Sequence, residues 1–130
     1  MKMVCSDKKS GKSAQFDVDK DRSPSLIGKK MGDSLDGSII GLDGFELHIT
    51  GLSDKTGAPS RKEIEGSIKA RPLLSAGTGI RHAKKGHRAR KLIRGNTISA
   101  DTEQVNAVIT KYGQKPLEEI FKAREKAEKK

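Results

Sequence analysis

The sequence contains little of several residue types on which disulfide-rich, zinc-binding and membrane proteins depend. Among its 130 residues it has one cysteine, Cys5, no tryptophan, one tyrosine and three phenylalanines. One cysteine cannot form an internal disulfide, and with three scattered histidines it does not supply a four-ligand zinc site. No apolar run approaches the about 18 residues of a membrane span, and charges interrupt the start, MKMVCSDKKS. We therefore expect a cytoplasmic protein without a metal, neither secreted nor inserted in a membrane.

The sequence also lacks a constellation of residues typical of an enzyme. Residues 10–13 (SGKS) end like a phosphate-binding loop, but Ser6 replaces its first glycine and a strand pattern follows. Residues 77–79 (GTG) begin a dinucleotide-binding pattern that fails at its third glycine, where His82 stands. With so few aromatic residues, a large apolar substrate cavity is not expected. We expect no catalytic activity, no cofactor and no small-molecule substrate.

The sequence does have an excess of positive charge, and it lies in one segment. The net charge is +10, from 27 basic and 17 acidic residues. Residues 61–94 contain eleven basic and two acidic residues, whereas residues 1–60 and 95–130 are nearly balanced. Such a segment indicates a nucleic-acid partner, whose phosphates it would neutralise. Seven of its cations fall within residues 81–94, without any acid between them: Arg81, Lys84, Lys85, Arg88, Arg90, Lys91 and Arg94.

We expect these seven cations to be the main contacts to nucleic acid. Second candidates, on the adjoining loop and strand, are Lys55, Arg61, Lys62 and Arg71. Proteins that bind single strands stack bases on aromatic side chains, and the basic segment has none, so structured RNA or duplex DNA is favoured. One alternative is a free-standing basic protein of duplex DNA or chromatin. A more remote one is an enzyme with an acidic or phosphorylated substrate.

Short alternating segments predict a mainly β fold. Apolar residues alternate with polar ones over 14–18, 45–49 and 105–109, and a turn at 9–12 predicts an N-terminal hairpin. A turn at 43–44 (DG) predicts a second hairpin, between 38–42 and 45–50. Two further strands are expected at 67–75, where Pro72 indicates an edge or a bulge, and at 89–95. Together they indicate a small barrel-like antiparallel or mixed β domain over residues 1–112.

The C-terminal segment has a different pattern. Pro116 is placed to open a helix, and Leu117, Ile120 and Phe121 are spaced to share one face. We therefore expect a C-terminal α-helix and basic tail over residues 113–130.

Three segments resemble a known family. They are residues 25–41 (SLIGKKMGDSLDGSIIG), 50–59 (TGLSDKTGAP) and 73–99 (LLSAGTGIRHAKKGHRARKLIRGNTIS). The last matches a signature of Leu-Leu-Ser-x-Gly, a basic loop, and Arg-Gly-Asn-Thr-Ile-Ser. Over residues 1–112 the sequence resembles the small-subunit ribosomal protein family number six of the archaeal and eukaryotic type. The resemblance implies a structural component of the small ribosomal subunit that binds and braces folded ribosomal RNA beside neighbouring ribosomal proteins. Ala58 and Ser60 depart from the Phe and Met usual in the family.

Overall fold

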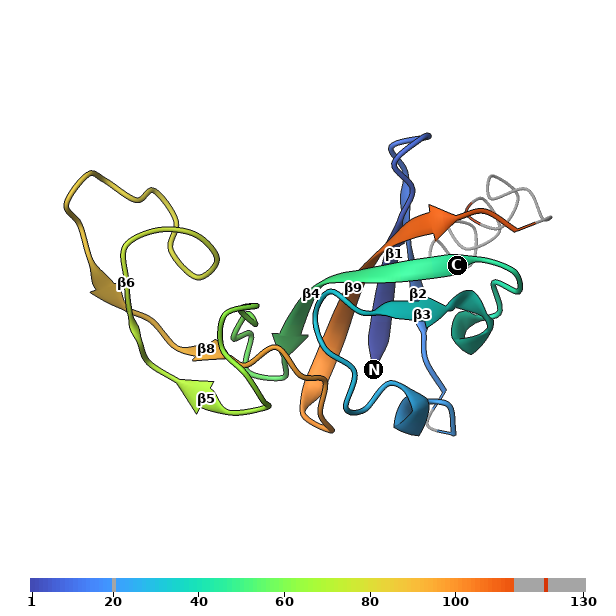
Figure 1. The fold of residues 1–130 in the computed structure, drawn as a ribbon, viewed down its shortest axis with the longest axis horizontal. Coiled ribbons are helices and arrows are strands. Elements are labelled where there is room, and N and C mark those ends of the chain that lie inside the picture. The colour runs from blue at the N-terminus through green and yellow to red at the C-terminus, as the bar shows by residue number, and fades with distance from the viewer. Residues whose placement is uncertain (20, 114–120, 122–130) are drawn as a thin grey trace, which may run out of the picture.

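The fold is built on a five-stranded sheet. The computed structural model describes residues 1–19, 21–113 and 121. The strand order of the sheet is β2-β1-β9-β4-β3 (Figure 1). Strands β1 and β9 run parallel, and all other neighbours in the sheet run antiparallel. The five strands are β1 (Lys2–Ser6), β2 (Ser13–Asp17), β3 (Ser34–Asp36), β4 (Glu46–Asp54) and β9 (Thr102–Lys111).

The alternation seen in the sequence sets which face of the sheet is buried. Side chains two residues apart point to the same face of a strand. Accordingly Met3 and Cys5 of β1, Phe16 of β2 and Leu47 of β4 all lie in the core. The described residue Phe121 joins them, with its ring centroid 6.5 Å from that of Phe16. The predicted N-terminal hairpin is confirmed, because β1 and β2 pair antiparallel from Lys2 opposite Asp17 to Ser6 opposite Ser13.

The second predicted hairpin is wrong in its first strand. The partner of β4 is β3, which precedes the expected segment, and residues of that segment form a 3-10 turn, η2 (Gly37–Ile40). The Asp36 side chain caps this turn by accepting a hydrogen bond from the Ser38 amide. A Cβ atom at position 37 would lie 2.4 Å from the Leu42 carbonyl oxygen, so only glycine fits there. The capped turn therefore prevents residues 38–42 from extending as a strand.

The predicted fold class is wrong in two respects. Strands β2 and β3 each have one neighbour in the sheet, so hydrogen bonding leaves the sheet open and does not close it into a barrel. In the described residues no helix reaches seven residues, and the named helical elements are the 3-10 turns η1 (Ser23–Ser25) and η2. The predicted C-terminal α-helix is therefore not among the helical elements of the described residues. Apart from Gly113 and Phe121, residues 113–130 lie outside the described residues.

A second part of the molecule extends away from the sheet (Figure 1). We call it the basic arm and define it as residues 61–95. It contains two small two-stranded sheets, one of β5 (Lys69–Ala70) with β8 (Ile93–Arg94), the other of β6 (Leu73–Leu74) with β7 (Ala89–Arg90). The arm thus carries the segment in which the sequence concentrates its positive charge.

Candidate nucleic-acid interface

The two small sheets of the basic arm form one interrupted ribbon. Ala70 pairs with Ile93 in the first sheet, and Leu73 pairs with Arg90 in the second, which is three residues further along each strand. The register is therefore the same on both sides of the interruption. The sequence predicted one strand over 67–75 with an edge or a bulge at Pro72; instead the strand is broken at Arg71 and Pro72, because proline has no amide hydrogen to donate to a ladder. The ribbon holds the loop between its strands, residues 75–88, away from the sheet (Figure 1). We call these residues the basic loop.

Four of the predicted cations lie on this loop. Arg81, Lys84, Lys85 and Arg88 are all exposed. The loop encloses a hollow of about 380 Å³ whose lining includes Lys84, Lys85, Arg88, His87 and Ser75. Several positive charges and a hydroxyl thus border one small space. Such a space suits an anionic oxygen group such as a phosphate.

The ribbon itself carries three more of the predicted cations. Arg90 and Lys91 are exposed on one strand, and Arg71 is exposed on the other. The Arg90 Nη1 atom lies 3.4 Å from the Arg71 carbonyl oxygen, to which it donates a hydrogen bond. No acidic residue occurs between Glu65 and Asp101, so no carboxylate within the ribbon or its loop offsets these charges.

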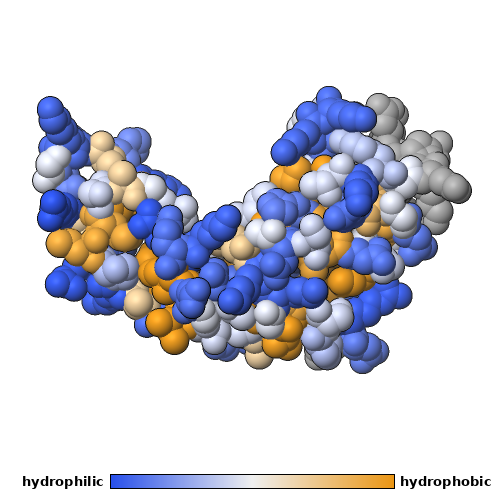
Figure 2. Space-filling view, in the orientation of Figure 1, coloured by the Kyte–Doolittle hydropathy of each residue, from blue (hydrophilic) through white to orange (hydrophobic). Residues whose placement is uncertain are grey.

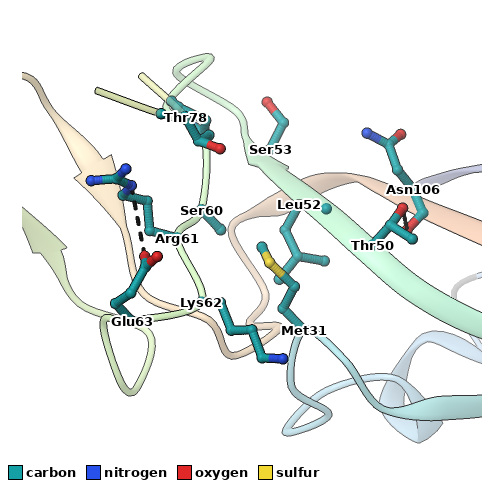
Figure 3. Close-up of a pocket in the computed structure, with 13 residues that line it drawn as sticks. Met31, Thr50, Leu52, Ser53, Ser60, Arg61, Lys62, Glu63, Thr78 and Asn106 are labelled. Atoms are coloured by element: carbon teal, nitrogen blue, oxygen red, sulfur yellow. Dashed lines mark hydrogen bonds and ion pairs between the residues drawn. The ribbon is translucent and has the colours of Figure 1, made fainter. Parts of the chain in front are cut away.

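Arg61 and Lys62 line a groove of about 450 Å³ where the arm meets the sheet (Figure 3). Arg61 is largely buried; its Nη2 atom donates to the Ala76 carbonyl oxygen at 2.7 Å, and its Nε lies 3.7 Å from Glu63. It therefore holds the start of the basic loop in place. Lys62 is exposed and points away from Arg61 toward Met31. On the sheet side the groove is lined by polar side chains, including Thr50, Ser53 and Asn106.

Arg94 differs from most of the other predicted cations because its side chain is buried. Its side chain is 4% exposed, and its Nη1 lies 2.9 Å from Oδ1 of Asp54, which is 1% exposed at the end of β4. Its Nη2 donates to the Ser99 hydroxyl at 2.6 Å and to Asp101 at 3.5 Å. This guanidinium joins the arm to the sheet and is not available to a ligand.

Asp54 also pairs with Lys69, which is not among the cations predicted from the sequence. Lys69 of β5 places its Nζ 2.8 Å from Asp54 Oδ2, so both arm strands at this level are tied to one carboxylate. Burial alone would raise the pKa of Asp54, but the hydrogen bond from Lys69, the Lys55 amide and the charge of Arg94 lower it to about 2. Lys55 is exposed beside this cluster, with its Nζ 4.0 Å from Asp101.

The arm also exposes apolar side chains that the sequence did not reveal. Ile93 is fully buried, but its neighbour Leu92 is 40% exposed. Leu73 is 51% exposed. Figure 2 shows hydrophobic residues at the surface of the arm among hydrophilic ones, and a hollow between the arm and the sheet. In the sequence these leucines cannot be distinguished from buried ones, because only the folded ribbon shows that they are exposed.

Other reactive or metal-binding groups are few in the described part of the chain. Cys5 is buried in the core, and burial raises the pKa of its thiol to about 12. Among the residues that the structure describes, no group of three or more His, Cys, Asp and Glu side chains is arranged to hold a metal ion. Within the same residues, no helix has the length and apolar character needed to cross a membrane.

An open sheet with a protruding, acid-free cationic ribbon defines a small basic β protein. The family model described as ribosomal protein S6e matches residues 1–122, and the chain belongs to this family. The chain is therefore a ribosomal protein of the cytoplasm and not an enzyme, as the sequence predicted.

Three curated relatives, each named small ribosomal subunit protein eS6, show how far the similarity extends. The relative from Methanothermobacter thermautotrophicus is 50% identical, over 95% of this chain and 97% of its own. That from Methanocella arvoryzae is 46% identical, over 98% and 89%. That from Methanocaldococcus jannaschii is 45% identical, over 92% and 89%. The resemblance noted in the sequence is thus confirmed along nearly the whole chain.

Proposed function

We propose that this protein is a structural component of the small ribosomal subunit, and that its basic arm binds and braces folded ribosomal RNA. The relatives' names support the first part. The second part rests on one observation: the loop at the end of the ribbon gathers Lys84, Lys85 and Arg88 around a hollow of about 380 Å³, with Arg81 exposed on the same loop and no acid between Glu65 and Asp101. Along the ribbon, exposed Lys91 adds positive charge on one face, and exposed Arg71 and Arg90 add it on the other.

The remaining predicted cations take different parts in this proposal. Lys62 and Lys55, both exposed near the base of the arm, are additional phosphate contacts. Arg61 positions the basic loop, since its guanidinium donates a hydrogen bond to the Ala76 carbonyl oxygen. Arg94 fixes the angle between the arm and the sheet through Asp54 and makes no contact with RNA.

Recognition by this surface depends on the shape of the RNA. Arg and Lys contacts to phosphates position a protein without reading bases, and the arm has no aromatic side chain on which a base could stack. Duplex DNA, the partner in the alternative function, differs from RNA in helix geometry and lacks 2′-hydroxyls. We therefore expect folded ribosomal RNA to bind more tightly than duplex DNA or a single strand at the same salt concentration.

Sedimentation and competition together test this function. The full-length protein should travel with small ribosomal subunits at moderate salt and leave them at high salt. In a competition assay, exchanging paired bases within the bound RNA helices should change affinity by well under the roughly 1 to 3 kcal/mol of a lost bidentate base contact. Unstructured oligonucleotide or duplex DNA that competes as well as folded small-subunit RNA would contradict the proposal, and so would absence of the protein from small subunits.

A further inference from the structure

The ribbon of the basic arm has two faces, and the protein covers one of them itself. In a two-stranded ribbon, side chains alternate between the faces, and directly paired residues share a face. Leu74 and Ile93 lie on the covered face and are buried. The chain around Gly79 lies over them: a Cβ atom at this glycine would be 3.2 Å from Ile93 Cγ2 and 3.8 Å from Leu74 Cδ1. This side of the ribbon therefore has its own small core.

The opposite face has no such cover among the described residues. Leu73 pairs with Arg90 on this face. Because the register continues through the interruption, Arg71 and Leu92 also fall opposite each other, one step further along the ribbon. All four side chains are exposed, and the two leucines lie diagonally across the strands. We call this set the leucine face: Leu73, Leu92, Arg71 and Arg90.

The composition of the leucine face indicates what it binds. Large apolar side chains left half-exposed between guanidinium groups are typical of protein interfaces, where apolar anchors are enclosed by a polar rim. The two arginines, with no acid between Glu65 and Asp101, favour a partner with negative charge at that rim. A sugar-phosphate backbone supplies charge but little apolar surface. A protein segment with apolar side chains flanked by carboxylates supplies both.

We propose that the leucine face docks a neighbouring protein of the small subunit, through a segment in which apolar side chains are flanked by Asp or Glu. The arm then has two kinds of contact in the subunit. Its loop binds RNA, and its ribbon packs against its own small core on one face and against a protein on the other. This inference rests on the proposed function, because the partner is present only in the assembled subunit.

Photo-crosslinking from the full-length protein in assembled small subunits tests the partner class. A photoreactive benzoylphenylalanine at position 73 should give a product that resists ribonuclease, is digested by protease, and maps to a segment containing acidic and apolar residues. The same group at position 88, on the basic loop, should give a ribonuclease-sensitive product. An RNA product or a second copy of this chain at position 73 would overturn the inference, as would no product there when position 88 reacts.

A pair of variants provides an independent test. Replacing both exposed leucines (L73N/L92N) should leave the affinity for isolated folded ribosomal RNA within about twofold of wild type, yet reduce retention on small subunits after a high-salt wash about tenfold. Ile27→Asn, which alters an exposed apolar residue outside the arm, should change neither measurement. Equal retention of wild type and L73N/L92N overturns the leucine-face inference alone. Wild-type protein that never enters small subunits contradicts the proposed function instead.

Discussion

The carboxylate of Asp54, at the end of β4, lies 2.9 Å from the guanidinium of Arg94, in the last strand of the basic arm. Both side chains are almost fully buried, and they lie forty positions apart in the sequence. The pair joins the sheet to the arm at the point where the two parts meet. The orientation of the loop that we propose binds RNA therefore depends on two buried residues outside that loop.

Removing one partner of this pair should destabilise the protein. Asp54→Asn leaves the Arg94 guanidinium buried with only the more distant Asp101 as a counter-charge, so we expect a loss of about 3 kcal/mol in the free energy of unfolding. The double variant D54N/R94M removes the orphaned charge and should recover more than half of that loss. Urea denaturation of wild type, D54N, R94M and the double variant measures both quantities. Additive losses in the double variant would show that the two residues do not interact.

Acid should unfold the protein in a defined pH window. Burial opposes ionisation of Asp54, but its cationic partners lower its pKa to about 2, and the hydrogen bond from the Tyr112 hydroxyl holds the pKa of Asp7 well below its usual range. Carboxylates with a lowered folded-state pKa contribute stability above their unfolded pKa of about 4, and this stability is lost as pH falls toward the folded value.

Thermal denaturation across pH measures this effect. The Tm should be nearly constant from about pH 7 to 5 and fall steeply between about pH 4 and 2. Tyr112→Phe, which removes the donor to Asp7, should make the acid-induced fall smaller. A wild-type Tm that already declines between pH 7 and 5 would assign the pH dependence to other groups.

Close backbone packing at the base of the arm makes Gly95 irreplaceable. A Cβ atom there would lie 2.0 Å from the Gly66 carbonyl oxygen, a backbone atom that cannot move aside without opening the ribbon. Gly95→Ala should therefore cost about 3 kcal/mol or more. Gly51→Ala in β4 is the matched control, since its Cβ would be 3.6 Å from Asn106 Nδ2, an ordinary contact. Similar stabilities of the two variants in urea would contradict the close approach.

The basic loop should become ordered when RNA binds. Backbone hydrogen bonds inside residues 76–88 include Ile80 amide to Gly77 oxygen and His87 amide to Lys84 oxygen, both in turns, and the second turn is fully exposed. We expect amides of this loop to exchange rapidly in the free protein, and to be protected when folded small-subunit RNA is added. Hydrogen exchange followed by mass spectrometry makes this measurement, with central β4 as the protected reference. Slow exchange in the free protein would indicate a preformed surface instead.

Local pattern predicted the parts of the fold that depend on local pairing. Alternation at Ala14, Phe16 and Val18 indicated the N-terminal hairpin, and that at Leu47 and Ile49 indicated β4. The placement of β9 between β1 and β4 could not be predicted in this way, because it pairs residues about a hundred positions apart in the chain.

In the candidate site too, features that depend on contacts between distant residues could not be predicted from the sequence. Counting charges located the basic loop, whose cations are exposed as expected. Counting could not separate Arg94 from Arg90, because the difference lies in Asp54, which reaches Arg94 only in the folded protein. Nor could it show that Leu73 and Leu92 face solvent, since each adjoins another large apolar residue, Leu74 or Ile93, and only the fold shows which of the two is buried.

The salt dependence of RNA binding tests the central claim most directly. Affinity of the full-length protein for folded small-subunit ribosomal RNA is measured at several salt concentrations, for wild type, for K84A/K85A/R88A on the basic loop, and for K8A/K9A/K12A on the turn between β1 and β2. If the loop contacts phosphates, the first triple variant should lower the slope of log affinity against log salt by about three. The second should leave it close to wild type. Equal changes in slope for the two triple variants would contradict binding through the basic arm.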